Sequence, residues 1–511
     1  PETQDGEPIC QSWRQMVNIG YAHDGLIGSV QEQLRRAQKE IGFTYLRFHG
    51  IFDDDMHIYQ ENEDGSPWFN FAYADLLFDF IQEIGLIPYV ELGYMPSKLA
   101  KTQYTVFDNP AICISMYNDS EKWQALVQAC LSHWIDKYGL ANVRKWRFTV
   151  FSMNYSRLQY TAPVMSHEDY CKMFEATYQT IKMIDPELKL GGAGCFPGIA
   201  LAPDGLRRFL LDVKEHGCPP DFITVQCYPH EDFSQDSDFF YFTSKQTSMP
   251  SVLSKDKNFT LHFLQRLNRI RQEIGFADCP VVVEEWNSTL WQRDLSGDTC
   301  YKAAWLIKNV LQNYDQAEYL GYWLLTDFLD EWLVPGGVFH GGYGLFTING
   351  IPKAGYQALR MLGRIGERKI ASGEGWFVSR TENTIQVYLY HYCHYDALYR
   401  YRYQKLTDPH DAYKVFEVDG RLKIELELCG LDPGVYRQES WTLNRSAGSA
   451  FDKWLEMEAP RVMTPDDLNY LNDMAQPLCK IRDADTAGAL HLQTELEPHE
   501  VRLIVLKKRD G

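Results

Sequence analysis

The chain has 511 residues, of which 45% are hydrophobic, and a formal net charge of −19 at pH 7. This length exceeds the roughly 250 residues of an ordinary eight-stranded α/β barrel, which predicts one such domain joined to a second. The hydrophobic content argues against a disordered chain. The negative charge argues against nucleic-acid binding by this chain, because phosphate contacts need clustered Lys and Arg.

Cysteine usage and the lack of apolar runs bear on the cellular compartment. The 12 cysteines occur singly between Cys10 and Cys479 without a CxxC or another metal-like spacing, which predicts free thiols, a reducing cytoplasm and no metal site. The sequence has no run of 18 apolar residues and no signal peptide, so we expect no membrane partner. It begins with Pro, and we therefore expect it to be processed or cut from a longer protein.

Residues 16–366 alternate short β-rich runs with amphipathic helical stretches such as 29–41 and 167–184. This alternation is typical of a parallel α/β fold. Eight such βα units predict a closed (β/α)8 TIM barrel, whose function lies at the carboxyl ends of its strands. The predicted strands are 16–19, 45–48, 87–92, 146–151, 188–191, 222–226, 281–285 and 319–324.

The helical alternation stops near Glu367, and short β-rich runs separated by turns follow it. This pattern predicts an all-β sandwich over residues 367–511, with residues 1–15 adding a strand to it. Aromatic residues alternate with polar ones over 388–403, which favours a half-buried strand over a sugar-binding face. The clearest runs are 375–378, 384–392, 422–428 and 501–506.

The predicted seventh barrel strand continues as Val-Val-Val-Glu-Glu-Trp-Asn-Ser-Thr over residues 281–289. A carboxylate where a barrel strand ends suits a glycosidase, which needs one as nucleophile. It equally suits a structural ion pair with a neighbouring helix. Because side chains alternate along a strand, we expect Glu284 and Glu285 to point to opposite sides, with only one facing the barrel mouth.

Motifs along most of the chain resemble those of the β-xylosidases of glycoside hydrolase family 39. Glu-Glu-Trp-Asn-Ser at 284–288 is similar to the family's Thr-Glu-Trp/Tyr-Asn-Ser motif, which implies that Glu285 is the nucleophile position of a retaining glycosidase. The resemblance covers residues 12–510 and implies a TIM barrel with a β-sandwich. The other matching motifs are 45–55, 69–75, 90–96, 297–304, 321–327, 339–345 and 457–461.

The predicted fourth strand departs from the family pattern at the acid/base position. The family has Trp-x-Phe-Glu-x-Trp-Asn-Glu-Pro-Asn, and Trp146 and Phe148 set the register of that pattern here. Ser152 then replaces the Asn that holds the sugar's 2-hydroxyl, and Met153 replaces the acid/base Glu. Methionine cannot donate or accept a proton. The loss is serious, because general acid–base assistance is typically worth ~10²–10⁴ in rate.

Most other sugar contacts implied by the resemblance are retained. After the sixth strand, Gln226 replaces a His of the family; it can bind a hydroxyl group but carries no charge. Three changes at one barrel mouth predict lost or greatly weakened hydrolysis. The implied substrate-binding residues are His49, Ser152, Gln226, Tyr228, Trp323 and Glu331.

The charged residues near the mouth also have structural explanations. Arg47 is expected to pair with Glu285 or Glu91 inside the barrel, and without the family pattern His49 is best explained as a core histidine. Another acid could replace the missing proton donor, but a general acid must lie within hydrogen-bond reach of the glycosidic oxygen. The candidates at the strand ends are Asp53, Asp54, Asp55, Glu91, Asp330 and Glu331.

Three functional hypotheses follow. The first is a noncatalytic or weakly catalytic domain that binds xylose or short xylo-oligosaccharides as a sensor, similar to the family 39-like domains in the C-terminal part of AraC-type transcriptional regulators. The second is an active retaining β-xylosidase with Glu285 as nucleophile and a non-standard proton donor. The third is a structural or oligomerisation module, because members of the family often form homo-oligomers. No cofactor is implied.

Overall fold

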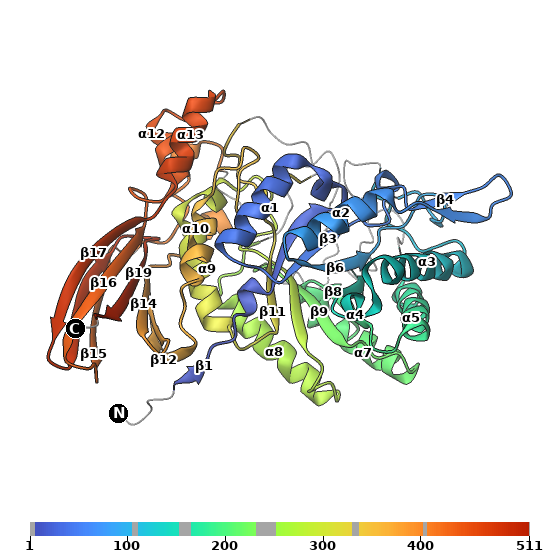
Figure 1. Cartoon of the computed structure of the whole chain (residues 1–511), viewed down its shortest axis with the longest axis horizontal. Helices are drawn as coiled ribbons and strands as arrows, with labels where there is room; N and C mark the ends of the chain where they lie inside the picture. The colour runs from blue at the N-terminus through green and yellow to red at the C-terminus, as the bar shows by residue number, and fades with distance from the viewer. Residues whose placement is uncertain are drawn as a thin grey trace.

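The computed structural model describes residues 6–104, 111–152, 165–230, 252–329, 337–401, 406–418 and 420–509. Its larger part is a closed barrel of eight parallel strands, on the right of Figure 1. All eight predicted barrel strands are confirmed. Around the barrel they are β10 (Val281–Trp286), β11 (Tyr319–Tyr322), β2 (Met16–Tyr21), β3 (Tyr45–His49), β6 (Ile87–Leu92), β7 (Arg147–Val150), β8 (Lys189–Cys195) and β9 (Phe222–Cys227).

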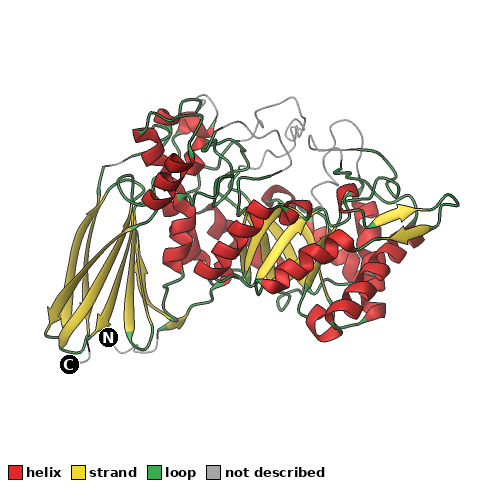
Figure 2. Cartoon of the chain, turned by 45° about the horizontal axis from the view of Figure 1, so that its top comes forward, coloured by secondary structure: helices red, strands yellow, loops and turns green. Residues whose placement is uncertain are grey.

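The outer layer of the barrel consists of helices that cover its strands (Figure 2). Side-chain caps fix several helix starts: Asp119 accepts hydrogen bonds from two backbone amides of the next helix, and Ser166 forms a capping box with Asp169. The helices are α1 (Gly28–Glu40), α2 (Ala72–Glu83), α3 (Ser120–Tyr138), α4 (Leu140–Val143), α5 (His167–Ile184), α6 (Pro197–Ala200), α7 (Leu206–Glu215), α8 (Phe259–Glu273), α9 (Cys300–Asn313) and α10 (Ala354–Leu362).

Shorter elements complete the barrel region. A hairpin of β4 (Tyr59–Glu61) and β5 (Pro67–Phe69) projects on the right of Figure 1. Short 3-10 turns are η1 (Ser12–Arg14), η2 (His23–Leu26), η3 (Asp54–Met56), η5 (Leu295–Asp298) and, further on, η6 (Pro409–Asp411).

The two ends of the barrel interior differ in chemistry. A buried and mainly aromatic cluster fills the amino end, and most of its members come from the first residues of their strands. Charged residues follow further along the same strands, so the apolar plug closes one end and leaves polar chemistry for the other. The cluster consists of Met16, Tyr45, Tyr89, Phe222, Val282 and Tyr319.

The C-terminal part is an antiparallel β structure on the left of Figure 1. One sheet has the order β1-β12-β13-β14-β19-β16-β17, and a separate pair is β15-β18. A buried apolar cluster with side chains from both, including Ile424, Leu492 and Ile504, joins them as a sandwich. The strands are β1 (Glu7–Pro8), β12 (Arg368–Gly373), β13 (Trp376–Arg380), β14 (Thr384–Tyr390), β15 (Leu422–Cys429), β16 (Gly434–Leu443), β17 (Leu478–Thr486), β18 (Ala489–Leu496) and β19 (Val501–Lys508).

The sequence pattern predicted an all-β C-terminal region, and this prediction is wrong. The region also contains α11 (Ala397–Arg400), α12 (Ala450–Glu456) and α13 (Pro465–Met474). The last two helices begin at side-chain caps from Ser449 and Thr464. They pack on the loop after β11, where the ring of Phe339 lies 5.4 Å from that of Trp454. Short amphipathic helices of this kind are easily mistaken for turns between strands.

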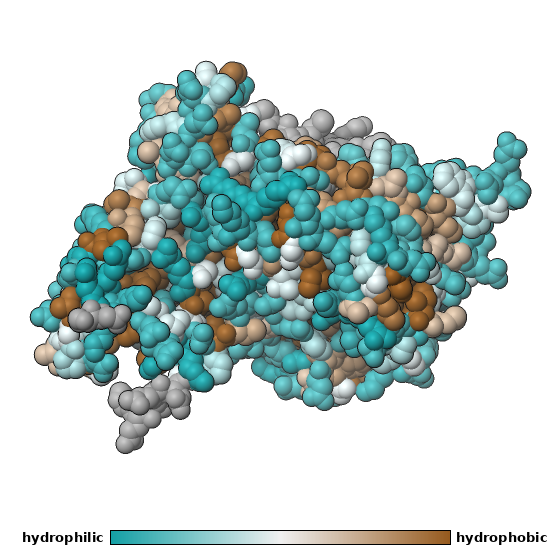
Figure 3. Space-filling view, viewed as in Figure 1, coloured by the Kyte–Doolittle hydropathy of each residue, from teal (hydrophilic) through white to brown (hydrophobic). Residues whose placement is uncertain are grey.

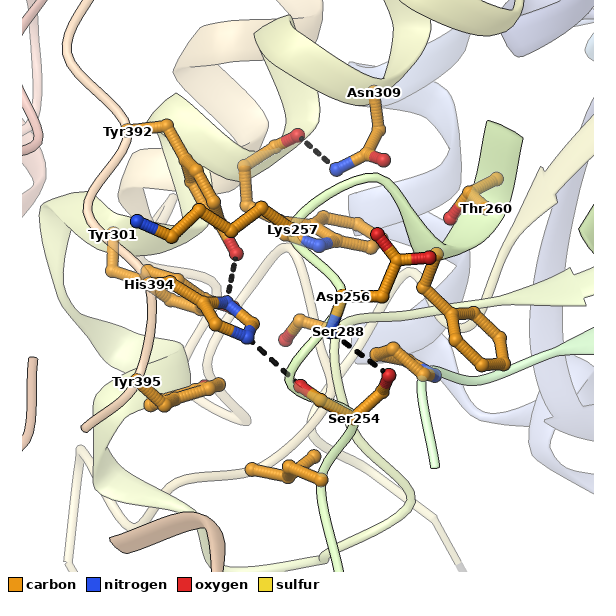
Figure 4. Close-up of a pocket in the computed structure, with 14 residues that line it drawn as sticks. Ser254, Asp256, Lys257, Thr260, Ser288, Tyr301, Asn309, Tyr392, His394 and Tyr395 are labelled. Carbon is orange, nitrogen blue, oxygen red and sulfur yellow. Dashed lines mark hydrogen bonds between the residues drawn. The ribbon is translucent and has the colours of Figure 1, made fainter. Parts of the chain in front are cut away.

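The barrel and the sandwich meet at a tightly packed joint (Figure 4). His394 Nε2 lies 2.8 Å from the carbonyl oxygen of Ser254, and its Nδ1 lies 2.8 Å from the hydroxyl of Tyr392. Burial lowers the pKa of His394 to about 4, which keeps the imidazole neutral. The cavity beside it holds only about 10 Å³. That is scarcely room for one water molecule, so the joint is packing rather than a ligand site.

The surface in Figure 3 is mainly hydrophilic, with apolar residues in scattered patches. Across the described ranges, no helix is long and apolar enough to cross a membrane.

Candidate active site

Several barrel strands bring polar side chains together towards their carboxyl ends. β3 supplies Arg47 and His49, β6 supplies Glu91, and β9 supplies Gln226. Each of these side chains is at most 5% exposed. Their burial means that every charge must be balanced within the cluster itself.

Strand β10 places two carboxyl groups in the barrel, not one. The register of β10 shifts against β9 between Val283 and Glu285, and against β11 over the same stretch. As a result Arg47 lies 2.9 Å from an oxygen of Glu285 and 3.6 Å from one of Glu284. The prediction that the two glutamates point to opposite sides of the strand is therefore wrong. Strict alternation assumes a regular strand, and the irregularity in β10 removes it.

Glu285 is surrounded by hydrogen-bond donors. Its Oε1 lies 2.9 Å from Arg47 Nη1, 3.1 Å from His49 Nε2 and 3.0 Å from Gln226 Nε2. Its Oε2 accepts a hydrogen bond of 3.0 Å from the Tyr228 hydroxyl. Burial favours the neutral acid, but Arg47 and the His49 hydrogen bond outweigh it and lower the pKa of Glu285 to about 2. Glu285 is thus held as a carboxylate with fixed orientation.

His49 bridges two carboxylates. Its Nδ1 lies 2.6 Å from Glu91 and its Nε2 lies 3.1 Å from Glu285. Carboxylates only accept hydrogen bonds, so both ring nitrogens must carry protons and His49 is an imidazolium. Burial lowers its pKa, but Glu91 and the two hydrogen bonds raise it to about 10. His49 therefore serves as a second buried cation beside Arg47.

Arg47 is the centre of the charge network. It is fully buried and donates to Glu91 at 2.6 Å and to Glu285 at 2.9 Å, as the sequence predicts for one or the other. Asn18 adds an acceptor to the guanidinium at 3.2 Å and donates its own amide to the carbonyl of Glu284. Asn18 was missed in the sequence, although a buried polar residue inside an apolar strand is a signal that could have found it.

Glu284 differs from Glu285 in its protonation. Burial raises its pKa, Arg47 opposes that rise, and the charges of Glu91 and Glu285 raise it further, to about 8. Among the described residues, its Oε2 has no hydrogen-bond partner. The cluster then holds two cations, Arg47 and His49, against two carboxylates, with Glu284 neutral at pH 7. This balance leaves no excess negative charge for a metal ion.

The acid/base side of the site is described only in part. Ser152 is 4% exposed and its hydroxyl donates to the carbonyl of Gly194. Met153 lies outside the described residues, and so does Glu331. A Cβ built on Gly194 would lie 2.4 Å from Glu284 Oε1 and 3.4 Å from the Cα of Ser152. Glycine at this position therefore makes room for Glu284 directly beside the strand end that carries Ser152.

Other predicted residues lie close to this network. Trp323 follows β11 and is 3% exposed, and its ring centre lies 5.0 Å from that of His49. Glu91 uses both of its oxygens on Arg47 and His49. Asp53 accepts a backbone hydrogen bond of 3.0 Å from Tyr94. The contacts of Glu91 leave it poorly suited to deliver a proton to a substrate. Burial raises the pKa of Asp53 well above its usual value, so its contact with Tyr94 does not exclude it as a donor.

A buried lysine, which the sequence did not single out, supports the loop after β10. Lys302 on α9 donates to the side chains of Asn287 and Ser288, within the Glu-Trp-Asn-Ser motif. Burial lowers the pKa of Lys302 to about 7. The Asn and Ser of the motif are therefore explained by loop support.

The fold and this cluster define a glycosidase-type (β/α)8 barrel with a carboxylate held at the end of its seventh strand. The chain belongs to glycosyl hydrolase family 39, because the model of that family, "Glycosyl hydrolases family 39", matches residues 1–491.

Relatives and solved structures agree with this assignment. A β-xylosidase of Geobacillus stearothermophilus is 26% identical over 506 residues, which cover 98% of this chain and 94% of that protein. A β-xylosidase of Caldicellulosiruptor saccharolyticus is 33% identical over 365 residues, 70% of each chain. The fold is similar to a monomeric β-xylosidase from Caulobacter crescentus CB15, with a TM-score of 0.85 at 23% identity, covering 99% of this chain and 98% of that one.

A more distant similarity concerns regulators. An uncharacterized HTH-type transcriptional regulator of Staphylococcus aureus is 22% identical over 233 residues, which cover 45% of this chain and 29% of that protein.

Proposed function

We propose that this chain binds a pentose or a short xylo-oligosaccharide at the carboxyl end of the barrel and hydrolyses it weakly or not at all. The observation that carries the proposal is the pairing of an intact Glu285 with Met153 at the acid/base position. Retaining hydrolysis needs a second carboxyl group to protonate the leaving oxygen and then to activate water. Methionine does neither.

The charge network supports binding without chemistry. Carboxylates such as Glu285 accept hydrogen bonds from sugar hydroxyls, while Gln226 and Tyr228 add neutral polar groups beside it. Trp323 supplies an aromatic ring of the kind that stacks on a pyranose. We assign substrate contacts to these residues, to His49 and Ser152, and to Glu331 on the strength of the family pattern.

The biological role we propose is that of a sugar sensor. The similarity of part of the chain to an uncharacterized HTH-type transcriptional regulator supports it. All 12 cysteines are free thiols, which supports a reducing cytoplasm. We also propose that residues 16–366 form the barrel domain and residues 367–511 the sandwich domain, to which residues 1–15 add a strand. We propose a homo-oligomer as the assembly.

The test is xylobiose hydrolysis by the purified protein, with Glu285→Gln as control. Xylobiose has a poor leaving group, so it depends on the missing acid. We expect no turnover above the control, together with a higher melting temperature in the presence of xylobiose, since a ligand that binds only the folded state stabilises it. Fast turnover that vanishes in Glu285→Gln would overturn the proposal.

The second candidate is a retaining β-xylosidase with a displaced proton donor, and Glu284 favours it. This carboxyl group is neutral at pH 7, with a pKa of about 8, and lies beside the strand end that carries Ser152. Its 1% exposure argues against direct contact with a glycosidic oxygen. The discriminating variant is Glu284→Gln: any wild-type turnover should disappear in it if Glu284 is the donor and persist if it is not.

A further inference from the structure

Helices α5 and α7 present metal-ligating side chains to each other in the helical layer outside the barrel strands. His167 and Cys171 lie four residues apart on α5, and therefore on the same face of the helix. Asp212 faces them from α7, with its Oδ2 2.9 Å from His167 Nε2. The sulfur of Cys171 lies 3.5 Å from the same nitrogen.

The geometry points to a divalent-metal site of the zinc type at His167, Cys171 and Asp212, and we propose that this chain binds one such ion there. The three donor atoms all lie within 4.8 Å of one another. Ligands about 2.0–2.3 Å from a zinc ion in a tetrahedral arrangement are separated by less than this. Cys171 Sγ and His167 Nε2 are 3.5 Å apart, which suits two ligands of one tetrahedral ion, and Asp212 has a side chain that is 34% exposed and not packed in place.

The donor set determines which class of ion fits. One imidazole nitrogen, one sulfur and one carboxylate oxygen suit Zn²⁺ or Co²⁺, whereas Mg²⁺ and Ca²⁺ prefer oxygen ligands alone. Metal binding replaces the thiol proton of Cys171, which goes to solvent, and the Nε2 proton that His167 shares with Asp212. The imidazole then binds the ion through Nε2 as the neutral tautomer protonated at Nδ1, and any further proton is also released to solvent. A water molecule completes the tetrahedron, because His167 and Asp212 are partly exposed and Cys171 forms the buried floor.

Neighbouring groups bear on the strength of the site. Arg208 lies 3.5 Å from the same oxygen of Asp212, but its side chain is 48% exposed and can move into solvent. One helical turn further along, Glu175 on α5 contacts His216 at the end of α7. The two helices therefore carry a second pair of possible ligands beside the first. The spacing of 41 residues between Cys171 and Asp212 explains why no local sequence motif reveals the site.

The experiment is a titration of chelator-treated, reduced protein with Co²⁺, whose bond to a thiolate gives a charge-transfer band in the near ultraviolet. We expect about one equivalent to bind, Zn²⁺ to displace it, and Mg²⁺ to leave it in place. Cys171→Ser should abolish the band, and His167→Gln should weaken Co²⁺ binding at least about 10-fold, a loss that even supporting partners of a ligand can cause.

The matched control is His133→Gln. His133 on α3 lies 2.8 Å from Asp75 on α2, a partly exposed His–Asp pair between helices that belongs to no group of three possible metal ligands among the described residues. This variant should bind Co²⁺ like wild type. Three outcomes would overturn the assignment: no band, a band that survives Cys171→Ser, or equal losses in His133→Gln and His167→Gln. Loss of Co²⁺ binding only in His216→Gln would place the ion at the Glu175–His216 pair and would overturn the assignment as well. Melting curves of the metal-free variants exclude a folding defect.

Discussion

The two sides of the barrel mouth differ in how closely their residues follow the glycosidase pattern. On β3, β6 and β10, the residues around Glu285 form a complete network in which Arg47 and His49 neutralise two carboxylates. At the end of β7, the resemblance to the family pattern implies that Met153 stands at the acid/base position and Ser152 beside it. On this proposed assignment, the chain keeps one of the two carboxylates that retaining hydrolysis needs and lacks the other.

The contrast teaches that a nucleophile position can be retained for structural reasons. Glu285 is the acceptor for buried Arg47 and for His49, so its removal would leave buried charges without partners. We propose that this structural requirement alone is enough to preserve Glu285, whatever residue occupies position 153. Four predictions test this difference, from the largest expected effect to the smallest.

Met153→Glu should create or strongly increase xylobiose hydrolysis. If only the proton donor is missing, restoring it should raise kcat/KM by ~10²–10⁴, the usual worth of general acid–base catalysis. Met153→Gln, which is similar in size but cannot ionise, is the control and should stay inactive. Steady-state kinetics on xylobiose measure the effect. If Met153→Glu also stays inactive while still binding xylobiose, the nucleophile half is structural only.

Arg47→Met should destabilise the fold by about 3–5 kcal/mol, because it leaves buried carboxylates without their cation. Urea unfolding followed by circular dichroism gives the change in the free energy of unfolding. Arg35→Met is the control: Arg35 pairs with Glu83 at an exposed position and should cost less than about 1 kcal/mol. Equal losses in the two variants would refute a structural role for the network.

Glu284→Gln should change how stability depends on pH. The folded-state pKa of Glu284 is about 8, above the ordinary value of 4.5. Between these values the folded state holds a proton that the unfolded state lacks, so wild-type stability falls as pH rises, by up to about 1.4 kcal/mol per pH unit. A permanently neutral Gln removes this slope. The free energy of unfolding of the variant should therefore rise relative to that of the wild type between pH 5 and pH 8.

The measurement is urea unfolding of both proteins at several pH values. His49 and Glu285 contribute their own pH dependence in both proteins, so the difference between the two curves isolates Glu284. The control is Glu83→Gln at an exposed position, and its curve of unfolding free energy against pH should be parallel to that of the wild type. Parallel curves for Glu284→Gln too would mean that Glu284 is ionised in the folded protein at neutral pH.

Much of the fold could be predicted from the sequence, because barrel strands are short apolar runs at regular intervals. The sequence analysis did not predict helices α12 and α13, because short capped helices and turns have similar sequence patterns when tertiary contacts are unknown. Within the site, Glu285 followed from its motif. The interior position of Glu284 did not, because it depends on an irregularity in β10. The sequence predicted Glu285 or Glu91 as the partner of Arg47, but it could not show that Arg47 contacts both at once.

The smallest expected effect comes from Ser152→Asn in the Met153→Glu background. An amide at this position should hold the sugar's 2-hydroxyl, a contact that strengthens in the transition state of glycoside hydrolysis. One added hydrogen bond is worth about 1 kcal/mol, so kcat/KM should rise by roughly 5–10-fold. A 2-deoxy aryl xyloside lacks the hydroxyl and should show no gain. A gain on both substrates would mean that the larger side chain acts by repacking around Gly194, which already lies close to Ser152 and Glu284.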